Sequence, residues 1–255
     1  VRVSILPTAF GERVVMRLLD RSSKILTLPE LGMSDMQFKQ MRRVTHSPHG
    51  IALVTGPTGS GKSTTLYASL MEVDRNNRNV MTIEDPIEYQ LTGVAQMQVQ
   101  PKIGLNFAAG LRSILRQDPD IVMIGEIRDR ESMEAAMNLA GTGHLVITTL
   151  HSNNAPETLD RIINMFPQDQ HRQVYMDLSQ YLRAVVSQRL VRSVEGKRVA
   201  AVEVMLNTPH VSELINRGSI AEVKEAFAQS SEAGMQSFDS ALLELYKSGK
   251  ISMEE

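Results

Sequence analysis

A glycine-rich loop between a strand-like run and a helical segment is the feature that most constrains the fold. The loop reads GPTGSGKST, follows the apolar run IALVT and precedes the helix-like stretch STTLYASL. Its glycines allow consecutive backbone N–H groups to turn toward one centre, and the helix start adds partial positive charge. A loop of this form in this context is a phosphate-binding loop. The residues expected to bind nucleotide are Gly56, Pro57, Thr58, Gly59, Ser60, Gly61, Lys62, Ser63 and Thr64.

The middle of the chain alternates between short apolar runs and amphipathic segments. Continuous apolar runs are typical of strands that are covered on both faces, as in a parallel sheet. The alternation therefore predicts a doubly wound α/β core. The expected strands are residues 51–55, 80–84, 120–126 and 145–150, and the expected helices are residues 63–73, 107–117 and 130–140.

The two ends of the chain have different patterns. Residues 1–19 alternate around Pro7 and Gly11, which predicts a hairpin. Because a lone hairpin is only marginally stable, we expect its sheet partners upstream and a chain that is part of a longer protein. Further expected elements are a linker over 21–32, a helix over 34–45 with Ser34 as N-cap, a helix over 172–188, a hairpin of 190–193 and 198–206, and helices after Thr208 broken at Gly218 and Gly234.

Composition excludes several classes of protein. The chain has 255 residues without cysteine, which excludes disulfides and cysteine-ligated zinc. Its 27 basic and 29 acidic residues give a net charge of −2, which argues against a nucleic-acid partner. No apolar run is long enough to cross a membrane, and the start lacks the pattern of a signal peptide.

Acidic residues follow two of the expected strands, and a histidine follows a third. Ligands in open α/β sheets bind at the carboxyl ends of the strands, where Glu84, Asp85 and Glu126 are expected. One carboxylate there could deprotonate an attacking water while the other holds Mg²⁺, and the residues alone leave that assignment open. In the loop, Lys62 is expected to reach the β- and γ-phosphates and Ser63 to ligate Mg²⁺. His151 is a candidate sensor of the γ-phosphate.

Four motifs in order resemble the secretion-ATPase superfamily, which includes type IV pilus extension and retraction motors and type II secretion ATPases. They are GPTGSGKST, TIEDPIEY, RQDPDIVMIGEIRD and TGHLVITTLHSNNA, similar to the family's Walker A, Asp box, Walker B and His box. The resemblance implies a RecA-like ATPase core over residues 28–207. It also implies the end of a PAS-like N-terminal domain over 1–27 and a C-terminal helical region over 208–255.

The resemblance also implies roles for residues. Glu84 corresponds to the Asp-box glutamate implicated as general base, Glu126 to the Walker B glutamate near Mg²⁺, and His151 belongs to the His box. Arginines of the N-terminal strands and of the segment before residue 120 are expected to reach nucleotide across a domain or subunit interface. These candidates are Arg2, Arg13, Arg17, Arg112 and Arg116.

The function implied is a hexameric motor that hydrolyses Mg-ATP on the cytoplasmic face of the inner membrane, bound there to a pilus platform protein. The stretch from residue 161 onward resembles retraction motors, and the tetracysteine zinc motif of many extension and type II enzymes is missing. The opening residues 1–20 resemble extension motors and secretion ATPases instead. Because the C-terminal match is longer, pilus retraction and twitching motility are favoured over pilus extension or type II secretion. Two other hypotheses are a DNA-translocating relative and a regulatory subunit that binds nucleotide without turnover.

Overall fold

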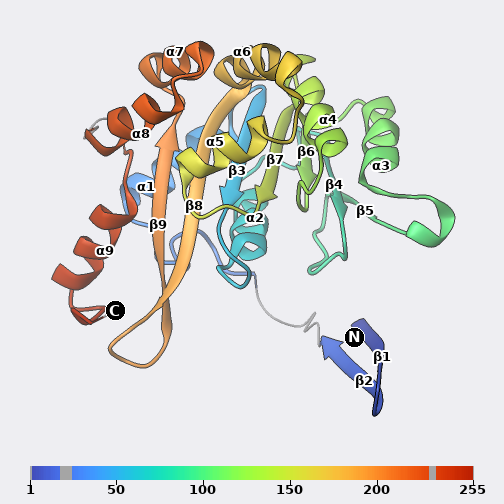
Figure 1. The fold of residues 1–255 in the computed structure, drawn as a ribbon, viewed down its shortest axis with the longest axis horizontal. Helices are drawn as coiled ribbons and strands as arrows, with labels where there is room; N and C mark the ends of the chain where they lie inside the picture. Colours follow the sequence, from blue (N-terminus) through green and yellow to red (C-terminus); the bar gives the residue numbers. More distant parts are fainter. Residues whose placement is uncertain (1, 18–24, 230–233, 255) are drawn as a thin grey trace.

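A computed structural model describes residues 2–17, 25–229 and 234–254 of the protein (Figure 1). Expectations that concern Val1, residues 18–24, residues 230–233 or Glu255 lie outside these described ranges. The strands are β1 Arg2–Thr8, β2 Gly11–Arg17, β3 Gly50–Thr55, β4 Val80–Glu84, β5 Ala95–Gln98, β6 Ile121–Ile124, β7 Leu145–Leu150, β8 Leu182–Arg192 and β9 Arg198–Leu206.

Seven strands form one sheet in the order β5-β4-β6-β7-β3-β8-β9. All neighbouring pairs are parallel except β8 and β9, which are antiparallel. Strands β3, β4, β6 and β7 are buried along their whole length, as their continuous apolar runs predict. The predicted α/β fold with a predominantly parallel sheet is therefore confirmed.

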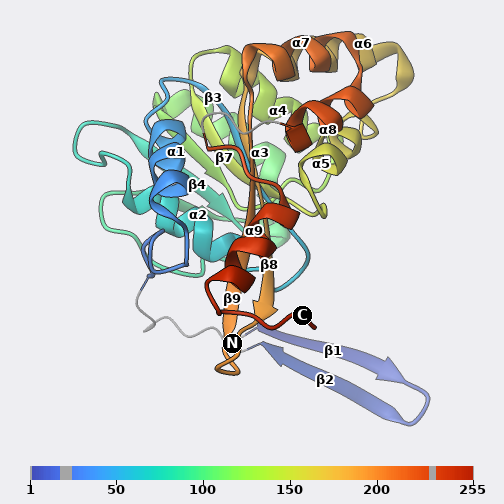
Figure 2. The same cartoon turned by 90° about the vertical axis from the view of Figure 1, so that its left-hand side faces the viewer.

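Helices cover both faces of this sheet (Figure 2). One face packs against α1 and α2 through a cluster that includes Val44, Leu66 and Leu70. The opposite face packs against α3 to α8, and its cluster includes residues of the helices after Thr208, such as Leu214. The helices are α1 Asp35–Thr45, α2 Lys62–Met71, α3 Phe107–Ile114, α4 Arg130–Gly141, α5 Ala155–Ile163, α6 His171–Tyr181, α7 Pro209–Arg217, α8 Ile220–Gln229 and α9 Phe238–Lys247.

The N-terminal hairpin forms as predicted within the described residues. Strands β1 and β2 pair antiparallel from Arg2↔Arg17 to Thr8↔Gly11 and pair with no other described strand. Apolar side chains on both of its faces are exposed, namely Val3, Ile5, Leu6, Val14, Val15 and Met16. The assignment of this segment to a PAS-like domain and the boundaries at 27/28 and 207/208 stay predictions.

The predicted helix over residues 172–188 is wrong in its second half. Helix α6 ends at Tyr181, and Leu182 begins the long strand β8. This strand pairs with β3 on one side and with β9 on the other, so two ladders satisfy its backbone groups. The predicted hairpin of residues 190–193 and 198–206 is confirmed, but its first strand begins at Leu182 instead of residue 190. Helix-like local spacing is overridden here by long-range pairing.

The other expected elements of the core are confirmed to within a few residues. Ser34 caps α1 in a capping box, in which Gln37 N–H donates to Ser34 Oγ at 3.3 Å and Ser34 N–H donates to Gln37 Oε1 at 2.8 Å. Sequence analysis missed β5, a half-exposed edge strand without an apolar run, and α5. No helix within the described ranges is long and apolar enough to cross a membrane.

Candidate nucleotide-hydrolysis site

The carboxyl ends of four parallel strands bring the predicted site residues to one edge of the sheet. β3 ends at the glycine-rich loop, β4 ends at Glu84, β6 leads into Glu126, and β7 leads into His151. Together with α2 these segments line a cleft of about 620 Å³. Lys62, Ser63, Glu84, Glu126 and His151 all line it, so the structure brings together residues that are far apart in the sequence.

Three glycines give the loop its shape because they have positive φ angles that disfavour other residues. These angles are +148° at Gly56, +79° at Gly59 and +90° at Gly61. A Cβ added at Gly56 would lie 2.3 Å from the backbone oxygen of Gln188, so the neighbouring strand also requires glycine there. Of the nine loop residues predicted to bind nucleotide, Thr58, Gly59, Gly61, Lys62, Ser63 and Thr64 line the cleft.

Lys62 is a buried ammonium group whose hydrogen-bonding capacity is not filled by the described residues. Its side chain is 9% exposed, and Nζ donates to the carbonyl oxygens of Gly56 at 2.8 Å and Pro57 at 2.9 Å. Burial lowers the pKa of Lys62, and the charge of Glu126 opposes this shift. An ammonium group has three donors, so a third proton remains to bind an anion in the cleft. Phosphate oxygens would supply the anionic partner that this buried cation lacks.

Gln188, which sequence analysis missed, holds the loop from strand β8. Its side chain is 2% exposed; Nε2 donates to Ser60 O at 2.7 Å and Oε1 accepts from Thr65 Oγ1 at 2.7 Å. The amide orientation is determined because the Ser60 carbonyl can only accept. No local signal marked Gln188, because residue 188 lay at the end of a predicted helix. Only the pairing of β8 with β3 brings it beside the loop.

We expect Gln188→Leu to weaken both the fold and nucleotide binding. The change leaves Ser60 O and the Thr65 hydroxyl buried without partners, which costs about 1–3 kcal/mol of unfolding free energy per group. Urea unfolding and titration with ATP measure the two effects. Gln180→Leu, at an exposed glutamine on α6, is the matched control. Wild-type stability and affinity in Gln188→Leu would contradict this role.

Glu84 is buried, and its carboxylate accepts three hydrogen bonds. The side chain is 3% exposed; Oε1 accepts from Thr82 Oγ1 at 2.6 Å and from Gln96 Nε2 at 3.1 Å, and Oε2 accepts from the Tyr67 hydroxyl. Burial raises the pKa of Glu84, and the three hydrogen bonds oppose this shift. A base must offer an oxygen to its water. The Glu84 carboxylate is therefore well placed to orient the side chains that donate to it. Its predicted role as base stays a prediction.

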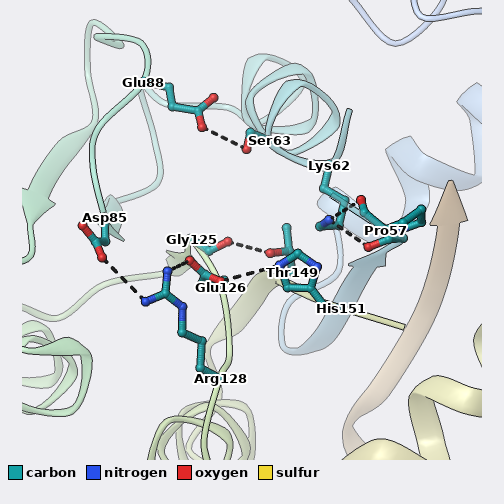
Figure 3. A network of polar contacts seen from close by, with 11 residues as sticks. Pro57, Lys62, Ser63, Asp85, Glu88, Gly125, Glu126, Arg128, Thr149 and His151 are labelled. Carbon is teal, nitrogen blue, oxygen red and sulfur yellow. Dashed lines mark hydrogen bonds and ion pairs between the residues drawn. The ribbon is translucent and has the colours of Figure 1, made fainter. Parts of the chain in front are cut away.

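Glu88, four residues later, also reaches the cleft, and sequence analysis assigned it no role. It is half-buried, lines the cleft, and its Oε1 accepts from Ser63 Oγ at 3.2 Å (Figure 3). The available signal was its place in TIEDPIEY, but three acids in five residues left the choice undecided. The conformation of the loop after β4 determines which of these acids faces Ser63.

On the opposite side of the cleft, Arg128 joins two carboxylates. It donates to Glu126 Oε1 through Nη2, and its Nη1 lies 3.7 Å from Asp85 Oδ2 (Figure 3). The hydrogen bond from Arg128 to Glu126 raises the pKa of the guanidinium. Thr149 Oγ1 donates to Gly125 O at 2.7 Å, which ties the Glu126 loop to strand β7. Arg128 is a further residue of this site that sequence analysis missed.

His151 lies next to Glu126, with Nε2 3.8 Å from Oε2. Burial lowers the pKa of His151, as does the nearby charge of Lys62, while Glu126 acts in the opposite direction. The net effect favours the neutral imidazole. A neutral ring can donate to or accept from a phosphate group or a water, which suits the predicted sensor role.

The oxygen donors around the cleft fit Mg²⁺. This ion takes oxygen ligands, keeps several waters, and is usually held by one or two protein groups together with phosphates. The Ser63 hydroxyl and the Glu126 carboxylate, the predicted ligands, both line the cleft. Within the described residues, no cluster of three acidic or histidine side chains forms an all-protein metal site. A magnesium ion that arrives with nucleotide matches this donor set.

Of the arginines predicted to contact nucleotide, the three with described side chains do not line the cleft. Arg13 is exposed on β2, and Arg112 is exposed on α3, where Nη1 lies 3.1 Å from Glu131 Oε1. Arg116 is also exposed. The side chains of Arg2 and Arg17 lie outside the described part of the structure. The roles of these arginines across an interface stay predictions.

The fold and the site define a P-loop nucleotide-binding protein of the α/β class. The family model described as "Type II/IV secretion system protein" matches residues 1–240, and the chain belongs to this family. Type II secretion system protein E of Dickeya dadantii is 54% identical over 193 residues, and type II secretion system ATPase E of Vibrio cholerae is 51% identical over 193. Each alignment covers 76% of this chain, and this chain spans 38% and 37% of the two relatives.

Solved structures have the same fold. The pilus retraction motor PilT with bound ADP matches with a TM-score of 0.85 and 35% identity, over 98% of this chain and 71% of PilT. The ATPase DotB of Legionella pneumophila matches with a TM-score of 0.82 and 28% identity, over 99% of this chain and 70% of DotB. The chain therefore shares its fold with a pilus retraction motor and with an ATPase.

Proposed function

We propose that the protein is a motor that hydrolyses Mg-ATP and works as a hexameric ring. The observation that carries the proposal is the buried Lys62 ammonium with a spare donor, at the base of a cleft whose walls carry Ser63, Glu88 and Glu126. Lys62 and the loop N–H groups bind the phosphates. Ser63 and Glu126 hold Mg²⁺, which neutralises negative charge on the transferred phosphoryl group.

Within this scheme Glu88 is the group best placed to accept a proton from the attacking water. Its carboxylate faces the Ser63 hydroxyl from the opposite wall, and Glu126 lies on the side of Arg128. Hydrolysis needs a water held in line with the bond that breaks, and a carboxylate at this place can orient that water and take its proton. His151, which follows β7, acts as the sensor that contacts the γ-phosphate.

The proposal also concerns the system that the motor drives, either type II secretion or a type IV pilus. The relatives that are 51–54% identical are type II secretion proteins, which favours type II secretion. Retraction of type IV pili is the second candidate, because PilT matches 98% of this chain, including its C-terminal helices. The RecA-like core, the location on the cytoplasmic face of the inner membrane and the inner-membrane platform partner belong to this same proposal.

The ring is tested by a dilution series of the full-length protein. Arg13, Arg112 and Arg116 are predicted to act from a neighbouring domain or subunit and do not line the cleft of one chain, so we expect specific ATPase activity to rise with protein concentration. Light scattering follows the oligomer across the same series. Turnover at an unchanged specific rate by a monomer would contradict the ring, and an assembled ring without turnover would support a regulatory subunit. Restoring secretion in a strain that lacks protein E, or twitching in one that lacks PilT, separates the two machines.

A further inference from the structure

The hydroxyl of Tyr67 is the point where the two walls of the cleft are joined. Tyr67 lies on α2 four residues after Ser63, so the two side chains share one face of the helix. Its ring is 2% exposed. The hydroxyl donates to Glu84 Oε2 and accepts from the backbone N–H groups of Glu88 at 3.1 Å and Tyr89 at 3.2 Å. One donor and two lone pairs are thus all in use.

Three further contacts hold the same loop in place. The rings of Tyr67 and Tyr89 pack edge to face with centroids 5.0 Å apart. Gln96, which donates to Glu84, also donates to Tyr89 O at 2.9 Å and accepts from Leu91 N–H at 2.7 Å. The segment after β4 is therefore tied at residues 88, 89 and 91, and Glu84 is the acceptor common to Tyr67 and Gln96.

These contacts bear directly on the position of the Glu88 carboxylate. The Tyr67 hydroxyl accepts from two consecutive N–H groups of the loop that carries Glu88. The backbone of Glu88 is thereby set relative to α2, the helix that presents Ser63 to the same carboxylate. An error of about 1 Å in the placement of a catalytic group can cost about 100-fold in rate.

We propose that Tyr67 is a positioning residue that holds Glu88 in place for hydrolysis, and that the buried carboxylate of Glu84 serves to orient the Tyr67 hydroxyl. This inference rests on the proposed role of Glu88 as base. It gives Glu84 a function that its three hydrogen bonds permit, since an engaged carboxylate can orient a donor without contacting nucleotide. Tyr67 acts on the reaction through Glu88 and not through nucleotide binding.

The kinetic test is Tyr67→Phe, which removes one oxygen atom. We expect kcat of the full-length protein to fall about 10- to 100-fold, with KM for Mg-ATP within about twofold of the wild-type value. Tyr246→Phe, at a half-exposed tyrosine on α9, is the control and should leave both constants unchanged. Single-turnover rates measured in the Glu88→Gln background complete a double-mutant cycle. In that background Tyr67→Phe should lower the hydrolysis rate hardly any further.

The structural test is amide hydrogen exchange. Tyr67→Phe should speed exchange in the peptide that spans residues 85–91 and leave exchange in β3 unchanged. If Tyr67→Phe does not fold, Glu84→Gln keeps the phenol, weakens its acceptor, and should loosen the same peptide. Additive losses in the cycle, or wild-type kcat and exchange in Tyr67→Phe, would overturn the proposal. Full turnover in Glu88→Gln together with a loosened loop in Tyr67→Phe would instead remove the base assignment and keep the anchoring.

Discussion

Lys62→Ala is expected to lower both nucleotide affinity and turnover while the fold is kept. Among the described residues, Lys62 supplies the buried ammonium of the loop, and its spare donor faces the cleft. Loss of one such group that stabilises developing charge costs on the order of 10²–10³-fold in kcat. Steady-state phosphate release and titration with ATP measure the two effects separately.

The fold of Lys62→Ala should survive, because Lys62 donates to two carbonyl groups at the edge of the loop and the variant removes a buried charge. Circular dichroism and thermal unfolding check this point. Lys102→Ala, at an exposed lysine between β5 and α3, is the matched control and should keep wild-type activity. Near-normal hydrolysis by a folded Lys62→Ala protein would contradict the assignment of the phosphate site.

Glu88→Gln is expected to bind Mg-ATP and lose hydrolysis. Loss of a general base costs about 10²–10⁴-fold in rate, and the amide keeps the size of the side chain and an acceptor for Ser63. Glu84→Gln should lose less, because its amide oxygen can still accept from the Tyr67 hydroxyl. Single-turnover rates and nucleotide affinities of both variants decide between the two acids.

The order of the two losses is the informative result. A larger loss in Glu84→Gln, with Glu88→Gln close to wild type, would return the base to Glu84, the residue that sequence analysis favoured. Glu222→Gln, at an exposed glutamate on α8, is the control for a change of one charge. If neither Glu84→Gln nor Glu88→Gln reduced turnover, the base would lie elsewhere, and Glu126 would be the next residue to test.

Sequence patterns predicted the strands that bear the site because these signals are local. A strand that is covered on both faces needs a continuous apolar run, and residues 51–55, 80–84 and 145–150 show it. The phosphate loop needs glycines at positive φ, and Gly56, Gly59 and Gly61 can be identified directly in the sequence. The edge strand β5 was not predicted, because an exposed edge strand does not need a continuous apolar run.

Strand β8 shows the opposite case. Its sequence from Leu182 continues the spacing of α6 closely enough to predict a helix, and only the two neighbouring strands make it extended. This one change brings Gln188 beside the phosphate loop, where a helix would have placed it elsewhere. A residue whose role depends on a partner more than 100 positions away has no local signal in one sequence.

The sequence by itself predicted a phosphate-binding loop at the end of a buried strand, because both the loop and its setting lie in consecutive residues. It also placed acids at the ends of β4 and β6. Tertiary structure decided which acid faces Ser63, because Tyr67, Thr82 and Gln96 donate to the Glu84 carboxylate, whereas Glu88 accepts from Ser63. The physical reason is that a carboxylate's role follows from the donors around it, and these donors come from three separate segments of the chain.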